Sequence, residues 1–310
     1  MNILLVGTWE DAERDAWAAA LSAAMPQHRL LLAREPATPI AAAVVANPPP
    51  GSLQGLPGLR LIQSLWAGVD RLMGDHTLPS GVPIARMVDP AMNSAMAETA
   101  LWAVLSLHRG FFQYAQQQQR RLWQVLPQRR ADEVNVLVLG LGQMGRAAAQ
   151  RLQQQGYCVA AWRREEGAGE PGLVVHSGMP ALQAALPAVQ VVVNLLPLTP
   201  ETRSLLGATF FSRLPQGAAI VNLARGAHVV DADLLAALDS GRVGHAVLDV
   251  FQTEPLPPEH RYWSHPGVTL LPHAAAQTDL RSAAGIAAAN IEALAAGRPL
   301  ANLVSSERGY

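Results

Sequence analysis

The sequence contains a single cysteine, Cys158, among its 310 residues. One thiol cannot form a disulfide within the chain, so a reducing compartment such as the cytoplasm is the expected location. Cys158 lies in an apolar run that predicts a buried strand, and we interpret it as a small core residue rather than a nucleophile.

The chain also lacks an excess of either sign of charge, because 23 basic residues balance 24 acidic residues and the net charge is −1. This balance does not favour a nucleic-acid partner or an anionic membrane surface. Long hydrophobic runs are missing as well, so no membrane-spanning segment is predicted. Residues 1–11 lack the basic region and long apolar segment of a secretory signal, and they predict a first strand instead.

Hydrophobic residues, in contrast, make up half of the chain, and its length suffices for two domains. Short apolar runs at residues 2–6, 42–46, 59–65 and 84–87 are separated by Pro and Gly. Residues 10–25 are rich in alanine and predict a helix that ends near Pro26. Alternating strands and helices predict an α/β fold with parallel sheets.

Residues 91–126 follow a different pattern, since they lack proline and are dominated by Ala, Leu, Gln and Met. One long helix or two joined helices are predicted, with the glutamine run at residues 116–119 on a solvated face. A final alanine-rich helix is predicted at residues 279–296, and it is expected to return to the first domain. The first domain would then combine residues 1–95 with residues 280–310, and the second would span residues 96–279.

The segment after residue 134 carries a glycine motif between two predicted strands. Residues 134–139 predict a buried strand, residues 146–155 a helix and residues 157–162 a second strand. Three glycines in G-x-G-x-x-G spacing follow the first strand: Gly140, Gly142 and Gly145. This strand–turn–helix–strand context predicts a dinucleotide site, with a purely structural glycine turn as the alternative.

Each glycine of this motif has a distinct expected role. Gly140 allows the tight turn, Gly142 lets the backbone approach a diphosphate, and Gly145 lets helix and strand pack closely. The N–H groups at the start of the helix, near Gln143 and Met144, would face the phosphates.

The second strand of this unit ends in two arginines, Arg163 and Arg164, where nicotinamide dinucleotide sites usually have an acidic residue. Glu165 and Glu166 come one or two positions too late for that role. Because guanidinium groups match phosphate oxygens, the pair predicts NADPH as the preferred cofactor, with NADH still possible. The alternative is that both arginines are solvated surface charges.

Three polar residues follow predicted strands in the second half of the chain: Arg225, Glu254 and His273. Further strands are predicted at residues 189–195, 218–223, 245–250 and 268–271, and Asp231 is a predicted helix N-cap. Ligands of open α/β sheets bind beyond the carboxyl ends of the strands, so these side chains are expected to face the cofactor. Each alone has a structural explanation, but together they supply a cation, a proton donor and its carboxylate partner, as the reduction of a 2-oxo acid requires.

These segments resemble the D-2-hydroxyacid dehydrogenase family, specifically its glyoxylate/hydroxypyruvate reductase branch, over essentially the whole chain. The matching motifs are W-A-G-V-D at residues 66–70, the glycine motif at 140–145, L-P-L-T-P-E-T at 196–202, N-L-A-R-G at 222–226, L-D-V-F-Q-T-E-P-L at 248–256 and P-H-A-A at 272–275.

The resemblance implies a catalytic role for each of the three polar residues. Arg225 would bind the substrate carboxylate and polarise the carbonyl group, and His273 would be the general acid. Glu254 would pair with the imidazole and raise its pKa. Formate dehydrogenases, a related branch, have glutamine at this position, so Glu254 argues against formate as substrate. Asp249 would accept a hydrogen bond from the nicotinamide carboxamide, or would simply cap a strand end.

The resemblance also implies the remaining binding residues. Backbone N–H groups of the W-A-G-V-D loop would meet the substrate carboxylate, and Gly68 would allow close approach. Trp66 would either narrow the pocket toward small substrates or pack between the domains. The residues of the substrate loop are Trp66, Ala67, Gly68 and Val69. The additional residues expected at the cofactor are Leu196, Pro197, Thr202, Leu223 and Ala224.

By the same resemblance, a flavodoxin-like substrate domain and a Rossmann domain would flank a cleft that closes on substrate. A homodimer is implied, with the long helix after Ala91 at its interface, and no metal is expected. The predicted activity is NADPH-dependent reduction of small 2-oxo acids such as glyoxylate and hydroxypyruvate to D-2-hydroxy acids. The alternatives are a dehydrogenase for a bulkier 2-oxo acid, an NAD-preferring enzyme, or a non-catalytic dinucleotide sensor.

Overall fold

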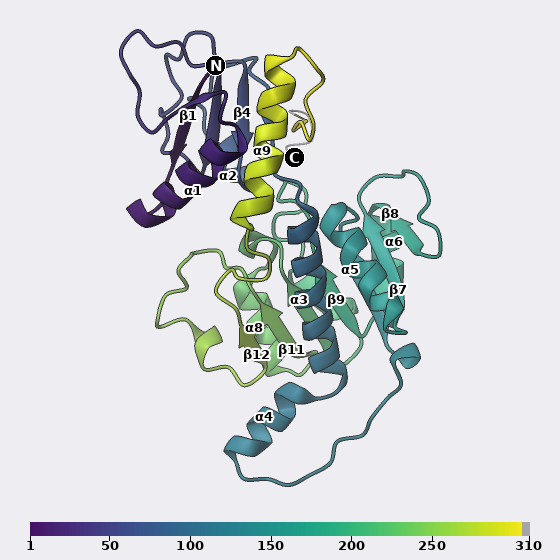
Figure 1. The fold of residues 1–310 in the computed structure, drawn as a ribbon. Helices are drawn as coiled ribbons and strands as arrows, with labels where there is room; N and C mark the ends of the chain where they lie inside the picture. Colours follow the sequence, from purple (N-terminus) through teal and green to yellow (C-terminus); the bar gives the residue numbers. More distant parts are fainter. Residues whose placement is uncertain (306–310) are drawn as a thin grey trace. The chain divides into compact units, whose positions relative to one another are not determined.

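The computed structural model describes residues 1–305, which form two compact units of α/β type (Figure 1). Unit 1 combines residues 1–92 with the chain from residue 278 onward, and unit 2 comprises residues 93–277. Each unit contains one parallel sheet with helices packed on it, which confirms the predicted α/β class with two Rossmann-like units. The final residues of the predicted first domain, 306–310, lie outside the described part of the chain.

Unit 1 is built on a five-stranded parallel sheet of order β2-β1-β3-β4-β5. Its strands are β1 (Asn2–Gly7), β2 (Arg29–Leu31), β3 (Ala42–Ala46), β4 (Leu61–Ser64) and β5 (Ile84–Ala85). Its helices are α1 (Asp11–Ala24), α2 (Asp70–Met73) and α9 (Leu280–Ala295). Every residue of β3 is buried, as expected for a strand covered on both faces.

Helix α9 returns from the far end of the sequence and packs on α1 and β4 within unit 1 (Figure 1). Asp279 caps the helix by accepting hydrogen bonds from the N–H groups of Arg281 (2.9 Å) and Ser282 (3.1 Å). Further along, buried Asn290 donates to Gln63 of β4 at 2.7 Å. Because both amides are buried, this pairing fixes the helix against the sheet.

Unit 2 is built on a seven-stranded parallel sheet of order β12-β11-β10-β9-β6-β7-β8. Its strands are β6 (Asn135–Leu139), β7 (Cys158–Arg163), β8 (Val174–Ser177), β9 (Val191–Asn194), β10 (Ala218–Asn222), β11 (Val243–Leu248) and β12 (Val268–Leu270). Its helices are α3 (Pro90–His108, which begins in unit 1), α4 (Phe111–Gln119), α5 (Gln143–Gln154), α6 (Gly178–Ala185), α7 (Ala208–Arg213) and α8 (Asp231–Asp239).

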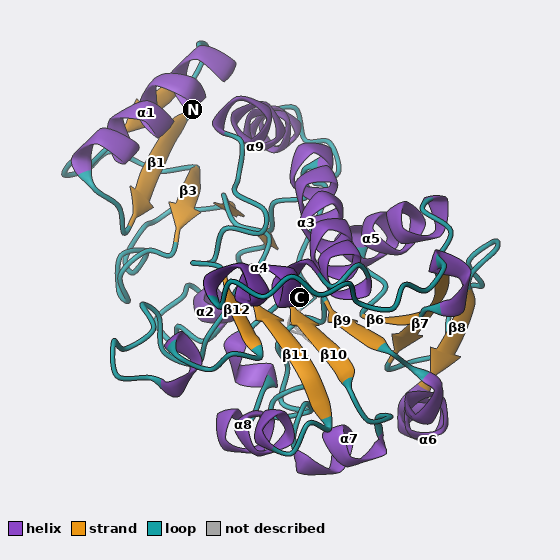
Figure 2. Ribbon diagram, turned by 90° about the horizontal axis from the view of Figure 1, so that it is seen from below, coloured by secondary structure: helices purple, strands orange, loops and turns teal. Residues whose placement is uncertain are grey.

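Helices cover both faces of this sheet (Figure 2). Helices α6, α7 and α8 bury Leu182, Phe211 and Leu234 on one face, and α3 and α5 bury Val104 and Leu152 on the other. Since both faces are covered, the central strands β6, β9 and β10 are apolar in continuous runs instead of alternating. The strand order reverses beside β6, which lies between β7 and β9, and ligands of such sheets bind at this kind of switch point.

The predicted helical region at residues 91–126 forms two helices, which resolves the alternative left open by the sequence. Gly110 separates α3 from α4 and adopts a left-handed conformation (φ 69°) that glycine tolerates best. Helix α4 ends at Gln119. The prediction that the helical region extends through residues 120–126 is therefore wrong. Within residues 1–305, every helix is too short or too polar to span a lipid bilayer.

The prediction that Cys158 is a core residue is wrong. Cys158 is the first residue of β7 and is exposed, while the next residue, Val159, is buried. Successive residues of a strand point to opposite faces of the sheet, so the Cys158 side chain points away from the face on which Val159 is buried. Because Cys158 is also the first residue of the strand, its thiol remains exposed at the strand end. Its Sγ instead lies 3.1 Å from the carbonyl oxygen of Asp132.

The prediction that Asp231 is an N-cap is also wrong. Helix α8 begins at Asp231 itself, and its N-cap is Val230. Asp231 directs its carboxylate to the hydroxyl of Tyr262 at 3.0 Å, while Asp233 accepts from the N–H of Ala208 at 2.8 Å. Both carboxylates remain in the first turn, where they favour the helix through its dipole.

Candidate active site

The glycine turn after β6 forms an open cradle at the start of α5. Gly140 has φ +94°, and a Cβ there would lie 2.8 Å from the carbonyl oxygen of Leu195. A Cβ at Gly145 would lie 1.9 Å from the carbonyl oxygen of Gly140, so helix and turn touch at this glycine. Around Gly142, by contrast, a Cβ would meet nothing within 4 Å.

The start of α5 is therefore suited to a diphosphate. Gly142 is the N-cap, so Gln143 and Met144 lie in the first helical turn. The N–H groups of a first turn have no acceptor within their own helix and bind anions readily. The open space at Gly142 leaves room for a ligand at that position, which is the fit that a dinucleotide requires.

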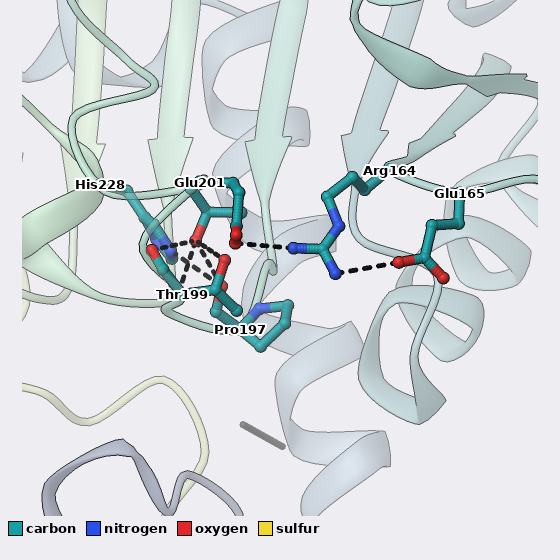
Figure 3. A network of polar contacts seen from close by, with 7 residues as sticks. Arg164, Glu165, Pro197, Thr199, Glu201 and His228 are labelled. Atoms are coloured by element: carbon teal, nitrogen blue, oxygen red, sulfur yellow. Dashed lines mark hydrogen bonds and ion pairs between the residues drawn. The ribbon is translucent and has the colours of Figure 1, made fainter. Parts of the chain in front are cut away.

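The two arginines after β7 have different partners. Arg163 donates to the carbonyl oxygen of Gly167 and to Oγ of Ser177 at 3.5 Å, and both of these acceptors are uncharged. Arg164 forms ion pairs with Glu201 at 2.7 Å and with Glu165 at 3.0 Å (Figure 3). Arg164 is thus part of an organised cluster rather than an isolated solvated charge.

The loop after β9 is stabilised by hydrogen bonds among its own residues. Thr202 is buried, donates to the carbonyl oxygen of Pro197 at 2.8 Å, and accepts from the N–H of Thr199 at 2.8 Å. Thr199 and Arg164 both hydrogen-bond Glu201 and lower the pKa of its carboxyl group. Leu196 is buried, and a Cβ at Gly140 would lie 3.0 Å from its backbone nitrogen, so this loop adjoins the glycine cradle.

The loop after β10 carries Arg225. Leu223 and Ala224 are buried at the strand end, and the Arg225 guanidinium donates to the Ala224 carbonyl oxygen at 2.7 Å. A Cβ at Gly226 would lie 1.9 Å from the carbonyl carbon of Phe251. Only glycine allows this approach, which brings the Arg225 loop against the loop that carries Glu254.

Glu254 and His273 form a hydrogen-bonded ion pair, with 2.8 Å between Oε2 and Nδ1. The hydrogen bond that the imidazole donates to the Glu254 carboxylate has the largest effect on the ring and raises the pKa of His273. Burial disfavours the carboxylate, but hydrogen bonds from His273 and the Phe251 N–H outweigh it and lower the pKa of Glu254. The charge of Arg225 lowers the pKa of both groups, so the structure brings all three residues into one cluster.

Asp249 directly follows β11 and is buried. Its Oδ1 accepts hydrogen bonds from the N–H groups of Ala274 (2.6 Å) and Ala275 (3.1 Å). Burial nevertheless raises the pKa of its carboxyl group. These contacts favour the structural alternative for Asp249, a cap on the turn that follows β12.

The W-A-G-V-D loop belongs to unit 1, where it follows β4. The ring of Trp66 packs edge-on against Trp17 of α1, with 6.3 Å between ring centroids and 84° between ring planes. Its backbone N–H donates to Oγ of Ser64 at 3.0 Å, and its carbonyl oxygen accepts from the N–H of Met87 at 3.0 Å. Ala67 and Gly68 are half-buried, and Val69 is buried as the N-cap of α2.

Three buried polar residues of unit 2 were not predicted from the sequence: Asn194, Asn222 and His228. All three are fully buried and belong to one hydrogen-bond network. A signal was present, because the apolar strands V-V-V-N and A-A-I-V-N both end in asparagine. Within residues 1–305, no group of His, Cys, Asp and Glu side chains is arranged to hold a metal ion.

Comparison with known proteins adds independent information. Residues 101–275 match the family described as "D-isomer specific 2-hydroxyacid dehydrogenase, NAD binding domain". The chain is 38% identical to "Glyoxylate/hydroxypyruvate reductase A" of Yersinia enterocolitica over 316 residues and 40% identical to the protein of the same name from Serratia proteamaculans over 317 residues. Both alignments cover 100% of each chain.

Two solved structures are similar over nearly their full length. A D-isomer specific 2-hydroxyacid dehydrogenase from Xanthobacter autotrophicus Py2, in complex with NADPH and MES, has a TM-score of 0.94 and 37% identity. An NADPH-dependent glyoxylate/hydroxypyruvate reductase from Sinorhizobium meliloti, in complex with NADP and sulfate, has a TM-score of 0.92 and 32% identity. Each comparison covers 100% of this chain and 99% of the other.

Proposed function

Because the chain belongs to the D-isomer specific 2-hydroxyacid dehydrogenase family, we propose that it is an NADPH-dependent reductase of small 2-oxo acids. The predicted family and the predicted enzyme class, an NAD(P)-dependent oxidoreductase, are thereby confirmed. The proposed substrates are glyoxylate and hydroxypyruvate. The proposed products are glycolate, which has no stereocentre, and the D-2-hydroxy acid formed from hydroxypyruvate. The observation that carries the proposal is the pair of Glu254 and His273, whose side chains lie 2.8 Å apart. The positive charge of Arg225 acts on both groups by lowering their pKa.

His273 is the proposed general acid. Its Nδ1 is engaged by Glu254, so its Nε2 is the ring atom that would donate a proton to the carbonyl oxygen. Because Glu254 raises the pKa of His273, a larger fraction of the imidazole is protonated near neutral pH. The same contact fixes the orientation of the ring, and in the reverse reaction the neutral imidazole would accept the proton.

Arg225 is the proposed anchor for the substrate. A guanidinium binds a carboxylate in a two-point geometry and leaves positive charge close to the adjacent carbonyl group. That charge stabilises the oxygen as negative charge develops on it. From the family motif, the backbone N–H groups of Ala67, Gly68 and Val69 are proposed as further donors to the substrate carboxylate.

NADPH is the proposed cofactor, and it supplies the hydride when bound. The cradle at Gly142 and the first turn of α5 would hold its diphosphate, and Arg163 and Arg164 would hold its 2′-phosphate. Two structural relatives are described as complexes with NADPH or NADP, which supports this choice. Unit 2 is accordingly the proposed dinucleotide-binding domain and unit 1 the proposed substrate domain.

A substrate panel with both cofactors tests this proposal. We expect kcat/KM to be highest with glyoxylate or hydroxypyruvate and NADPH, and lower with bulkier 2-oxo acids or with NADH. Replacing both arginines, in an R163Q/R164Q variant, is expected to remove most of the preference for NADPH while NADH kinetics change little. A wild-type preference for NADH would contradict the cofactor assignment, and a preference for a bulky oxo acid would contradict the substrate assignment.

A further inference from the structure

A buried polar network at the ends of β9 and β10 consists of Asn194, Asn222 and His228. Asn194 ends β9 and Asn222 ends β10, and the two residues are direct partners in the parallel pairing of these strands. The side-chain amide nitrogen of Asn194 lies 2.9 Å from Oδ1 of Asn222 and 2.9 Å from Nδ1 of His228. All three side chains are fully buried, so their polar atoms depend on one another for hydrogen bonds.

The contacts determine which atoms donate. Oδ1 of Asn194 accepts from the N–H of Leu196, and Oδ1 of Asn222 accepts from the N–H of Ala224, each at 3.3 Å. These contacts fix both amide orientations, so the two hydrogens of the Asn194 amide point to Asn222 and His228. Nδ1 of His228 must then be the acceptor and its Nε2 must carry the hydrogen.

That Nε2–H group points to the loop after β9. It lies 3.2 Å from the carbonyl oxygen of Pro197 (Figure 3). Thr202 contacts the same oxygen at 2.8 Å. The other end of the network reaches the loop after β10, where Nδ2 of Asn222 donates to the carbonyl oxygen of Arg225 at 3.0 Å. His228 itself ends the short turn Gly226–His228 that directly follows Arg225.

We propose that His228 is a positioning residue that joins the loop of Pro197 to the turn that follows Arg225. The neutral imidazole accepts from Asn194 on one side and donates to Pro197 on the other, so it sets the spacing of the two loops. This inference rests on the proposed function, in which Pro197 belongs to the cofactor site and Arg225 binds the substrate. A buried network with every member satisfied specifies one arrangement, which an apolar contact between the same loops would not.

Two variants of His228 separate the two contacts. In H228N, the side-chain oxygen replaces Nδ1 and keeps the contact with Asn194, but the contact with Pro197 is lost. In H228Q, the longer amide reaches Pro197 in place of Nε2, but the contact with Asn194 is lost. We expect H228N to raise the Kd of NADPH by about tenfold or more while kcat at saturating NADPH stays within about threefold.

H228Q is expected to behave in the opposite way. Freeing the turn after Arg225 should raise the KM of the oxo acid or lower kcat by about 10- to 100-fold, with the Kd of NADPH within about threefold. The Kd is measured by NADPH fluorescence, independently of turnover. The control is H245Q, the same substitution on β11, where the imidazole contacts Thr269 at 2.9 Å; it should leave both parameters unchanged.

The tautomer of the His228 imidazole can be measured in the wild-type protein. Nitrogen NMR of histidine-labelled protein should show a buried imidazole in the Nε2–H form, and that signal should disappear in H228N. An Nδ1–H form at His228 would overturn the inference, as would equal losses of the same parameter in both variants in step with a lower Tm. If the wild type neither binds NADPH nor reduces a 2-oxo acid, the proposed function fails instead, and the NMR result still tests the network.

Discussion

At the scale of single residues, the backbone of His273 is the most informative feature. Its φ of 53° lies in the left-handed region, which costs a residue with a side chain about 1–2 kcal/mol. The His273 N–H bonds the carbonyl oxygen of Asp249 at 2.9 Å, and the Asp249 carboxylate bonds the next two N–H groups. Asp249 thus offsets the cost and holds the imidazole toward Glu254.

The pairing of Glu254 with His273 leads to a prediction for pH dependence. In the proposed reaction His273 must be protonated to act as the general acid, so kcat/KM for the oxo acid should fall as pH rises through the pKa of this histidine. Glu254 raises that pKa, so E254Q should move the falling limb of the profile to lower pH. Steady-state reduction rates across the pH range measure this shift. An unchanged profile in E254Q, with activity retained, would contradict the proposed pairing.

At the scale of elements, the βαβ rhythm and the glycine motif were predictable because apolar runs and turn glycines are local signals. The predictions that proved wrong concern residues at the ends of elements. Cys158 and Asp231 each lie at the first position of an element, where a shift of one residue changes which side a group faces. The network around His228 escaped prediction because its partners, Asn194 and Asn222, meet only through strand pairing.

The close approach of Gly226 to Phe251 predicts that the loops of Arg225 and Glu254 cannot keep their spacing if residue 226 carries a side chain. In G226A, the new Cβ would overlap the Phe251 backbone and force apart the loops of Arg225 and Glu254. We expect kcat/KM for the oxo acid to fall by about 100-fold, with a smaller change in the Kd of NADPH. G285A is the matched control, because a Cβ on this residue of α9 meets nothing within 4 Å. It should retain activity and stabilise unit 1 by up to about 1 kcal/mol.

At the scale of the whole molecule, the surface of α3, α4 and the segment after α4 predicts self-association. Large apolar side chains are exposed along it: Trp102, Leu105, Phe111, Leu122, Trp123 and Val125. Trp123 is 98% exposed. In Figure 1, α4 and the segment that follows it extend away from the sheet of unit 2. An apolar surface of this kind is typical of an interface, and we propose a second copy of the chain as its partner.

Light scattering after size-exclusion chromatography tests this proposal. The wild type should have twice the 33.0 kDa mass of one chain, and the L122D/W123D variant should have the mass of a monomer. V174D is the matched control, because Val174 is also exposed but lies on β8, at the opposite edge of the sheet from β12, and this variant should remain dimeric. A wild-type protein that is monomeric at micromolar concentration would rule out the homodimer.

The most direct test of the proposed chemistry compares H273A with the wild type in two measurements, the rate of glyoxylate or hydroxypyruvate reduction and the Kd of NADPH. We expect kcat/KM to fall by about 100-fold or more while the Kd of NADPH stays within about threefold. H265A, which removes another histidine paired with a carboxylate (Asp239, 3.3 Å), should keep full activity. Turnover by H273A within a few-fold of the wild type would contradict the assignment of His273 as the general acid.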